Sequence, residues 1–367
     1  MRSRIRGLVA ASTAVGLALT LAACGGDDGG SGGGSGETQN AAGESEGGGS
    51  EGGGSGGDGV GCDEAQGAVV GYSEPLPDPN FQFIERIMAQ ALGEYGAELR
   101  PVNANLDPGK QVADINTLVQ SGVDVLIANP IDPNATLPAF DRAREQGIPV
   151  IAQETTVGGP FFTNVTADVE SAAAQGAELL AETVGDGGQV AALNGPSFAE
   201  VIVRENEAFA AAAEEAGLEV VDTQVNQQIT PQGAQAIAQA WRDRYGADLA
   251  GVWTFNDTSA VGVASAFSGS DERPAIVSIN GQPEVIPLIE SGEVLATFDI
   301  RQDKLGQALA YAALGAICGT EVPEEIVVPV QLIDQSNAGE YRPLEERVED
   351  PFEVTFEERD GRTYVAG

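Results

Sequence analysis

Short apolar runs alternate with longer amphipathic runs along the chain from residue 67 onward. AVVGY at 68–72 and VDVLIA at 123–128 are almost entirely apolar, whereas the stretch at 81–95 carries apolar residues at helical spacing and ends at Gly96. A strand whose consecutive side chains are apolar is buried on both faces, which is typical of a parallel sheet covered by helices. The pattern therefore predicts an α/β fold with parallel sheets.

The same alternation continues through the second half of the chain. The first series closes with IPVIA at 148–152, and a helical pattern at 171–184 opens the second. The strands predicted for the second series lie at 189–193, 219–222, 250–255, 275–279 and 294–298. Two such series without a linker predict two doubly wound lobes, with a ligand cleft where the carboxyl ends of their strands face each other.

The first residues have the pattern of an export signal. Three arginines precede an apolar stretch at 7–22 that is too short to be a good membrane span. LAAC at 21–24 resembles a bacterial lipobox, which implies a signal peptide at 1–23 and a lipid-modified Cys24. An ordinary export signal with an unrelated cysteine is the alternative. The lipobox predicts a protein outside the cytoplasm, anchored by lipid to the outer face of the cell membrane.

Residues 24–61 are almost entirely glycine, serine, acidic and other small residues. Such a composition cannot bury a core, so it predicts a flexible tether between the lipid and the folded part. No other segment is long and apolar enough to cross a bilayer. The folded part then begins near residue 62 and is large enough for two domains.

The chain is strongly acidic, with 18 Lys and Arg residues against 56 Asp and Glu residues and a net charge of −38. Such a surface repels nucleic acid and anionic lipid, which argues against a DNA-binding role. The acidity either selects a partner or keeps an exported protein soluble in concentrated salt. The chain has no histidine, which excludes His-ligated zinc sites and His-based catalytic triads. We expect neither a metal nor a cofactor.

Five segments, taken in order, resemble one known family. They are IANPIDPNA (127–135), IPVIAQE (148–154), FNDTSAVGVASA (255–266), IVSINGQPE (276–284) and LATFDIRQDKLGQ (295–307). They are similar to the periplasmic binding protein type 1 family, and in particular to the ribose-type sugar-binding proteins of ABC importers. The resemblance covers about residues 66–335. It implies two doubly wound parallel-sheet lobes joined by a hinge of three crossings, near 155–165, 280–285 and 298–303.

The resemblance also implies domain boundaries. Lobe one would comprise 62–155 plus 301–320, lobe two 156–300 plus 321–345, and a C-terminal extension 346–367. Two cysteines in an exported domain are a candidate disulfide. In the implied fold, Cys62 enters the first strand at the end away from the cleft, and Cys318 ends a helix that runs back to that same end. The resemblance therefore predicts a disulfide between Cys62 and Cys318.

A sugar site needs aromatic rings against the sugar and planar side chains that hydrogen-bond adjacent hydroxyls. After the first strand the resemblance implies Tyr72, Ser73 and Phe81, the last as a stacking ring or as an anchor of the first helix. Glu154 stands where the family usually has aspartate. Arg204 resembles a binding arginine of the family, and the alternative is that it pairs with Glu200 or Glu207 on its own helix.

The remaining candidates lie in the second half. Asn256 matches the family's carboxamide and is the favoured ligand group, whereas Asp257 is expected to support the turn or to cap the helix that follows. Trp253 is expected to pack beneath the strand. Asn280 replaces a usual aspartate. Asp299 or Arg301 is expected to replace a family glutamine, because that position holds isoleucine.

The expected function is the capture of a small polar ligand, a monosaccharide or polyol, for the membrane permease of an ABC importer. The chain is expected to be a monomer. The alternative is a membrane-tethered sensor subunit that presents a sugar-like ligand to a receptor kinase. The effector half of a sugar-responsive repressor shares the fold, but the export signal opposes it. A glycosidase would need a carboxylate pair such as Glu154 with Asp257 or Asp299, and no feature of the sequence indicates the raised pKa that its acid requires, so we expect no enzyme.

Overall fold

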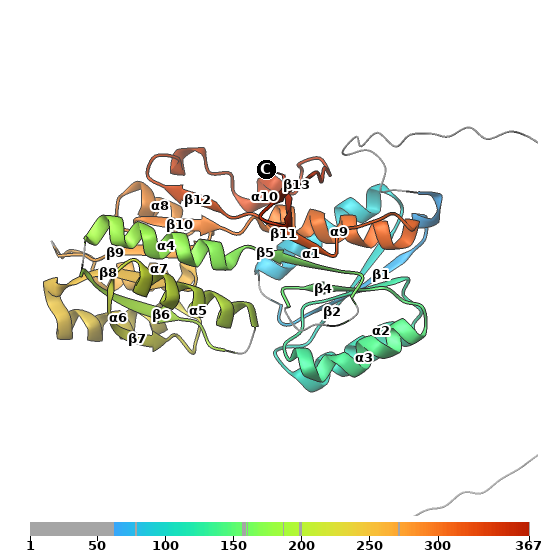
Figure 1. The fold of residues 1–367 in the computed structure, drawn as a ribbon, viewed down its shortest axis with the longest axis horizontal. Coiled ribbons are helices and arrows are strands. Elements are labelled where there is room, and N and C mark those ends of the chain that lie inside the picture. Colours follow the sequence, from blue (N-terminus) through green and yellow to red (C-terminus); the bar gives the residue numbers. More distant parts are fainter. Residues whose placement is uncertain are drawn as a thin grey trace, which may run out of the picture. The chain divides into compact units, whose positions relative to one another are not determined.

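The structure, a computed structural model, describes residues 62–77, 79–155, 159, 161–185, 187–197, 200–270 and 272–366. The expected signal peptide, Cys24 and the tether lie outside these residues. The described residues form two α/β lobes, each built on its own sheet (Figure 1). The prediction of two parallel-sheet lobes is confirmed.

The strands are β1 (Val69–Glu74), β2 (Glu98–Asn103), β3 (Val125–Ala128), β4 (Val150–Gln153), β5 (Thr163–Ala167), β6 (Gln189–Asn194), β7 (Glu219–Val225), β8 (Leu249–Thr254), β9 (Ala275–Asn280), β10 (Ala296–Asp299), β11 (Glu325–Val328), β12 (Gln331–Asp334), β13 (Phe356–Arg359) and β14 (Arg362–Val365). The α-helices are α1 (Pro79–Glu94), α2 (Pro108–Gln120), α3 (Pro133–Glu145), α4 (Val169–Val184), α5 (Glu200–Glu215), α6 (Pro231–Tyr245), α7 (Asp257–Ala266), α8 (Ile286–Glu290), α9 (Gln302–Cys318) and α10 (Leu344–Arg347). Short 3₁₀ turns lie at Asp63–Ala65, Gly246–Asp248 and Ala338–Glu340.

The first lobe contains an eight-stranded sheet in the order β13-β14-β11-β5-β4-β3-β1-β2. Helices α1 and α9 pack together on one face, and α2 and α3 pack on the other (Figure 1). Strand β3 is apolar throughout because its side chains enter two cores. Val125 and Ile127 pack beneath α1 and α9, and Leu126 and Ala128 pack beneath α2 and α3. Both faces of the strand are buried, as the sequence pattern predicts.

The second lobe contains a six-stranded sheet in the order β12-β10-β9-β8-β6-β7. Helices α4 and α5 cover one face, and α6, α7 and α8 cover the other. Helices α6 and α7 approach so closely that a Cβ on Gly262 would lie 2.2 Å from the carbonyl oxygen of Pro231. The glycine of the sequence FNDTSAVGVASA therefore sets the distance between two helices.

The chain crosses between the lobes at β5–α4, β10–α9 and β11–β12. The expected lobe boundaries differ from this arrangement in three places. Strand β5 pairs with β4, so residues 163–167 belong to lobe one, and β11 pairs with β5, so residues 325–328 do as well. The crossing expected near 280–285 is wrong, because the chain after β9 stays in lobe two and returns as β10. Hydrogen bonding along parallel strands decides these assignments, and the sequence pattern carries no record of which strands pair.

The C-terminal extension is an integral part of the first lobe. Strand β14 pairs in parallel with β11 and antiparallel with β13, so the last described residues close one edge of the first sheet. The predicted disulfide is also present. Cys62 and Cys318 are bonded with a Cα–Cα distance of 5.7 Å, which ties the start of the lobe to the last residue of α9.

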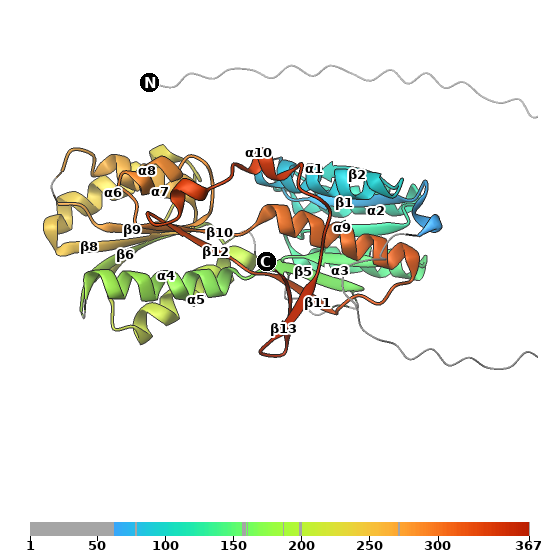
Figure 2. The same ribbon diagram turned by 90° about the horizontal axis from the view of Figure 1, so that it is seen from above.

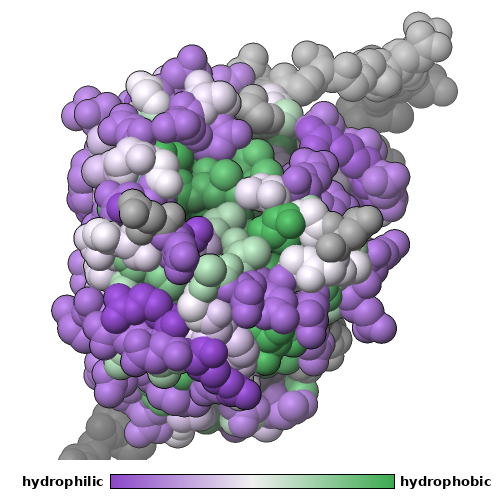
Figure 3. All heavy atoms as spheres, turned by 90° about the vertical axis from the view of Figure 1, so that its left-hand side faces the viewer, coloured by the Kyte–Doolittle hydropathy of each residue, from purple (hydrophilic) through white to green (hydrophobic). Residues whose placement is uncertain are grey.

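Figure 3 shows the side on which the second lobe lies, where hydrophilic residues surround apolar ones in the middle of the face. Among the described residues, no helix combines the length and the apolar character needed to cross a membrane.

Candidate functional site

Four neighbouring parallel strands of the second sheet end on an asparagine or are followed by one within two residues. These residues are Asn194 at the end of β6, Asn226 after β7, Asn256 after β8 and Asn280 at the end of β9. Each lies at the carboxyl edge of the sheet, where open α/β sheets bind ligands. A carboxamide both donates and accepts hydrogen bonds, so this edge carries neutral groups suited to hydroxyls.

Asn256 caps helix α7 with one end of its carboxamide. Its Oδ1 accepts a hydrogen bond of 2.9 Å from the backbone N–H of Ser259, and the side chain is 7% exposed. No described residue accepts a hydrogen bond from its Nδ2, so this donor is left for another partner. The cap expected from Asp257 is thus made by Asn256, because the helix begins at Asp257 itself.

Asp257 lies fully buried behind this edge and holds two strands and a loop together. Its Oδ1 accepts from the hydroxyls of Ser278 on β9 and Thr297 on β10, at 2.5 and 2.6 Å, and its Oδ2 accepts from the backbone N–H of Gln282 at 2.6 Å. Burial raises the pKa of this carboxyl to about 7, although the three donors favour the charged form. Asp257 is a structural residue, as expected. It stabilises the sheet and the loop after β9 and does not cap the helix.

Asn226 and Trp253 also serve the fold. Asn226 Nδ2 donates to the carbonyl of Thr230 and to the hydroxyl of Ser259, each at 3.0 Å, which joins the starts of α6 and α7. Trp253 is fully buried and stacks on Phe209 with ring centroids 4.9 Å apart. Its expected place beneath the strand is confirmed, and Asn194, Asn256 and Asn280 remain as candidate ligand groups.

Arg204 joins the two lobes rather than pairing on its own helix. Its Nη1 lies 2.7 Å from Glu170 Oε1 at the start of α4, and its Nη2 lies 3.6 Å from Glu154 Oε2, just beyond β4 of lobe one. The structure therefore contradicts the pairing with Glu200 or Glu207 that was the alternative. Both guanidinium ends already have carboxylate partners.

Glu154 is buried and is held by its own lobe. Its backbone has φ 57°, in the left-handed region, and its two oxygens accept hydrogen bonds from the backbone N–H of Ala167 at 2.9 Å and the hydroxyl of Thr166 at 2.8 Å. Burial raises its pKa, whereas these donors and Arg204 lower it. Glu154 is thus placed at the expected edge, with both oxygens already engaged.

Two further contacts join the lobes at their carboxyl edges, and the sequence did not reveal either. Gln282 Nε2, in the loop after β9, donates to Asn80 Oδ1 of α1 at 3.3 Å. Within lobe one, Gln302 Nε2 of α9 donates to the same oxygen at 3.0 Å. Thr155 Oγ1, beyond β4, donates to Glu200 Oε2 at the start of α5 at 3.0 Å. Asn80 directly precedes Phe81 in the sequence PDPNFQF, and this position beside a candidate residue was the only sequence signal for its role.

The three candidates after the first strand lie deeper than expected. Tyr72 is fully buried beneath α1 and α9, with its hydroxyl 3.1 Å from Gln153 Oε1, and Ser73 is fully buried as well. Phe81 is partly buried and packs against the same core, which favours its reading as an anchor of α1. Tyr72 and Ser73 are part of β1 itself, so their side chains enter the faces of the sheet and do not extend from its edge.

Asp299 and Arg301 belong to an ion-pair cluster at the second crossing. Asp299 is 1% exposed; its Oδ1 accepts from the backbone N–H of Arg301 at 2.8 Å, and its Oδ2 lies 2.6 Å from Arg347 Nη1. Arg301 is paired with Asp303 at 3.1 Å. The expectation that Asp299 faces a ligand is not met in this arrangement, because an arginine from the C-terminal extension occupies its free oxygen.

Glu205 on α5 is a buried acid that the sequence did not single out. It lies on α5 one turn before Phe209, and its Oε1 has no partner among the described residues. Burial, and then the charge of Glu170, raise the pKa of the Glu205 carboxyl well above its ordinary value.

None of the three acids considered for a glycosidase pair is open to a substrate. Asp257 and Asp299 are 0% and 1% exposed, and both oxygens of Glu154 are engaged within the protein. A retaining or inverting glycosidase needs two carboxyl groups that reach the glycosidic bond or its attacking water. In this arrangement these three acids do not form such a pair.

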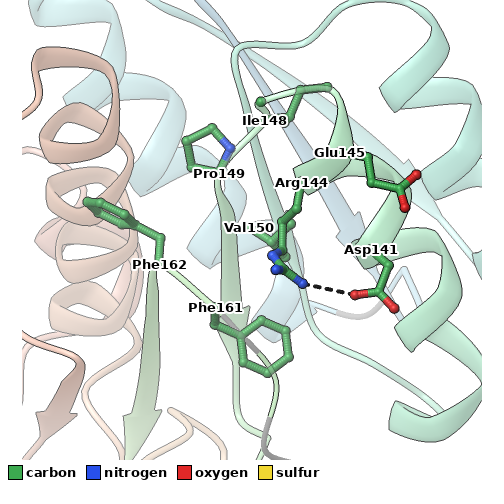
Figure 4. Close-up of a pocket in the computed structure, with 9 residues that line it drawn as sticks. Asp141, Arg144, Glu145, Ile148, Pro149, Val150, Phe161 and Phe162 are labelled. Atoms are coloured by element: carbon green, nitrogen blue, oxygen red, sulfur yellow. Dashed lines mark hydrogen bonds and ion pairs between the residues drawn. The ribbon is translucent and has the colours of Figure 1, made fainter.

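A pocket of about 590 Å³ opens elsewhere on lobe one, lined by Pro149, Val150, Phe161 and Phe162 where β4 and β5 begin (Figure 4). These are the amino ends of the strands, at the edge of the first sheet opposite its carboxyl edge. Arg144, which points into it, is paired with Asp141 at 2.9 Å. Because ligands of open α/β sheets bind at the carboxyl ends of the strands, this pocket is not part of the candidate site.

Comparison with known proteins shows the family of this chain and confirms its fold. The family model described as a periplasmic binding protein domain matches residues 75–321. The ribose import binding protein of Bacillus subtilis is 25% identical over 261 residues, which is 71% of this chain and 85% of that protein. The structure of a periplasmic ribose ABC transporter protein from Conexibacter woesei has a TM-score of 0.69 at 24% identity and covers 78% of this chain and 99% of its own.

A solute-binding protein of an ABC transporter from Bacillus halodurans, solved with bound myo-inositol, is similar in fold as well. Its TM-score is 0.68 at 22% identity, and the match covers 76% of this chain and 98% of that chain. At this level of identity the two solved structures show the fold, and the ligand has to be argued from the residues of this chain.

Proposed function

Because the chain belongs to the periplasmic binding protein family, we propose that it captures a small uncharged polyhydroxylated solute, a monosaccharide or polyol, and delivers it to the permease of an ABC importer. The relatives from Bacillus subtilis and Conexibacter woesei are named as an import binding protein and as a protein of an ABC transporter, and neither is named as an enzyme. Binding between the two lobes and closure around the solute are the steps that the fold offers.

The observation that carries the proposal is the row of carboxamides at the carboxyl edge of the second sheet. Asn256 uses Oδ1 for its helix and leaves Nδ2 as a donor, and Asn194 and Asn280 stand at the ends of the strands on either side of β8. Planar groups that donate and accept match the adjacent hydroxyls of a sugar.

The charges near the site support an uncharged ligand. Arg204 and Arg301 are the cationic candidates named for the site, and each already lies within 3.1 Å of a carboxylate oxygen. An anionic sugar or an amino acid would need a free cation for its carboxylate, because an unpaired charge is costly to bury. We therefore infer a neutral solute.

The N-terminal residues extend the proposal to the place of action. The export signal and the lipobox-like LAAC support a mature protein held at the outer face of the cell membrane through Cys24. Partition of the mature protein into a detergent phase, lost in Cys24→Ser, is the expected result, and equal partition of both would remove the anchor from the proposal.

The ligand class is tested by thermal unfolding with a panel of pentoses, hexoses, polyols, sugar acids and amino acids. A solute present at 100 times its dissociation constant stabilises the folded state by about 2.7 kcal/mol. We expect at least one neutral sugar or polyol to raise the midpoint by roughly 5 °C or more, and sugar acids to leave it unchanged. Stabilisation by an amino acid alone would contradict the sugar proposal.

Asn256 can be tested apart from its role in the helix. Asn256→Ser keeps a side-chain oxygen for the cap and removes the amide donor, whereas Asn256→Ala removes both. We expect both variants to bind the identified solute more weakly by about 1–3 kcal/mol, because a bound hydroxyl loses its partner. Only Asn256→Ala should also unfold more easily. Unchanged affinity in Asn256→Ser would leave Asn256 with a structural role alone.

A further inference from the structure

The C-terminal segment 335–366, called the strap below, runs from one lobe to the other. It leaves β12 in lobe two, where the hydroxyl of Tyr341 donates to the carbonyl of Gly281 at 3.0 Å, and it ends as β14 in the sheet of lobe one. Figure 2 shows its helix α10 between the elements of the two lobes. The strap is thus a connection between the lobes in addition to the three earlier crossings.

Two of those crossings begin with buried acids. Asp168 directly follows β5, Asp299 is the last residue of β10, and Asp303 lies in the first turn of α9; all three are at most 9% exposed. A buried carboxylate is costly unless an opposite charge or hydrogen bonds compensate it. These acids therefore need partners that stay in place.

The strap supplies the partner at the β10–α9 crossing. Arg347 Nη1 lies 2.6 Å from Asp299 Oδ2 and 3.2 Å from Asp303 Oδ1, and its Nε donates to the carbonyl of Arg342 at 2.9 Å. The guanidinium lies over the ring of Tyr341 at 5.3 Å and is itself buried. One side chain of the strap thus joins the end of a strand of lobe two to the start of a helix of lobe one.

The strap also supplies partners at the β5–α4 crossing. The hydroxyl of Tyr364 donates to Asp168 Oδ2 at 3.1 Å, and Arg362 Nη1 lies 3.6 Å from Asp168 Oδ1. Arg362 Nε is bonded to Glu325 Oε2 on β11 at 3.0 Å. Different residues of the same segment therefore hold each crossing.

The strap is also fastened to lobe one on either side of Arg347. Glu345 pairs with Arg86 of α1 at 2.6 Å, Gln307 of α9 donates to the carbonyl of Pro351 at 3.0 Å, and Phe352 packs edge-on against Tyr95. A segment fixed to one lobe and bonded to both crossings resists rotation of the lobes about them.

We propose that the strap is a brace of the hinge, in which Arg347 and Arg362 hold the lobes in the arrangement where Gln282 meets Asn80 and Glu200 meets Thr155. Arg347 is then a positioning residue for the binding site, since it acts through Asp299 and the crossing and does not touch the solute. A brace that favours the arrangement in which the lobes meet raises the fraction of binding-competent molecules and therefore the apparent affinity.

Hydrogen–deuterium exchange of the full-length chain without ligand tests the brace. We expect Arg347→Met, which keeps the apolar stem, to speed exchange in peptides covering 296–305 about tenfold, with amides of β1 and β3 unchanged. Arg362→Met should do the same for 163–170. The matched control is Arg342→Met, which removes the ion pair with Asp350 at 2.8 Å and the hydrogen bond to the carbonyl of Glu346 at 3.0 Å, both within the strap, and leaves the side chains at the crossings in place.

Wild-type exchange at 296–305 in Arg347→Met would overturn the proposal, and so would faster exchange spread evenly over both lobes, which indicates a general loss of stability. A second readout, which rests on the proposed function, is affinity for the identified solute. Arg347→Met should weaken it about tenfold, with Arg342→Met unchanged. If no solute binds the wild type, the proposed function fails while the exchange experiment still decides the brace.

Discussion

Removal of the disulfide by Cys62→Ser/Cys318→Ser is expected to lower the free energy of unfolding by about 2–5 kcal/mol. The two cysteines are 256 residues apart, so the bond closes nearly the whole described chain into one loop and restricts the unfolded state strongly. It also fixes the end of α9 to the residues that lead into β1. The midpoint of urea unfolding, compared between wild type and the double variant, measures the effect.

Reduction provides the matched control. A reductant should move the wild-type midpoint to that of the double variant and should leave the variant itself unchanged. A double variant as stable as the oxidised wild type would mean that the ends of this loop add nothing to the stability of lobe one.

The second large effect concerns pH and Asp257. Its pKa is about 7 in the folded protein, against 3.8 for an ordinary aspartate. The folded state therefore holds a proton that the unfolded state has released, so stability falls as pH rises from about 4 to about 7. The shift corresponds to a loss on the order of 4 kcal/mol above pH 7. Glu154, Glu205 and Asp299, whose pKa values burial also raises, act in the same direction.

Asp257→Asn isolates the contribution of one group. The carboxamide can accept from the backbone N–H of Gln282 while its amino group faces the hydroxyls of Ser278 and Thr297, which accept as well as donate. We expect the variant to match the wild type near pH 4 and to be more stable at pH 8, so that its midpoint of unfolding falls less with pH. Equal slopes for both proteins would show that Asp257 titrates at an ordinary pKa.

Much of the fold could be predicted because burial leaves a local record. The apolar runs gave the strands, the glycines after helical patterns gave the ends of helices, and ordered motifs placed the disulfide before any contact was known. The position of Asn256 at the carboxyl edge was predicted from the same pattern. Asp257 was expected to support the turn or to cap the helix, and the cap to Ser259 is made by Asn256 instead. Both residue types suit a helix start, and the sequence does not say where the first turn begins.

The candidate site was predicted less completely, since a side chain's availability depends on partners far along the chain. Asp299 or Arg301 was expected to replace the family glutamine, but Arg347, 48 residues after Asp299, bonds to the free oxygen of Asp299. Arg204 was expected to bind or to pair on its own helix, and its partners are Glu154, just beyond β4, and Glu170 on α4. The sequence could not identify these ion-pair partners, because helical periodicity identifies only neighbours three or four residues apart.

The sequence by itself therefore determined the α/β class, the two lobes, the family and the edge at which a ligand is to be sought. Tertiary structure alone decided which strands pair, so that β5 and β11 joined lobe one, and which charges are already satisfied. The physical reason is that periodicity records whether a position is buried, whereas hydrogen bonds and ion pairs depend on which distant groups the packed chain brings within about 3 Å.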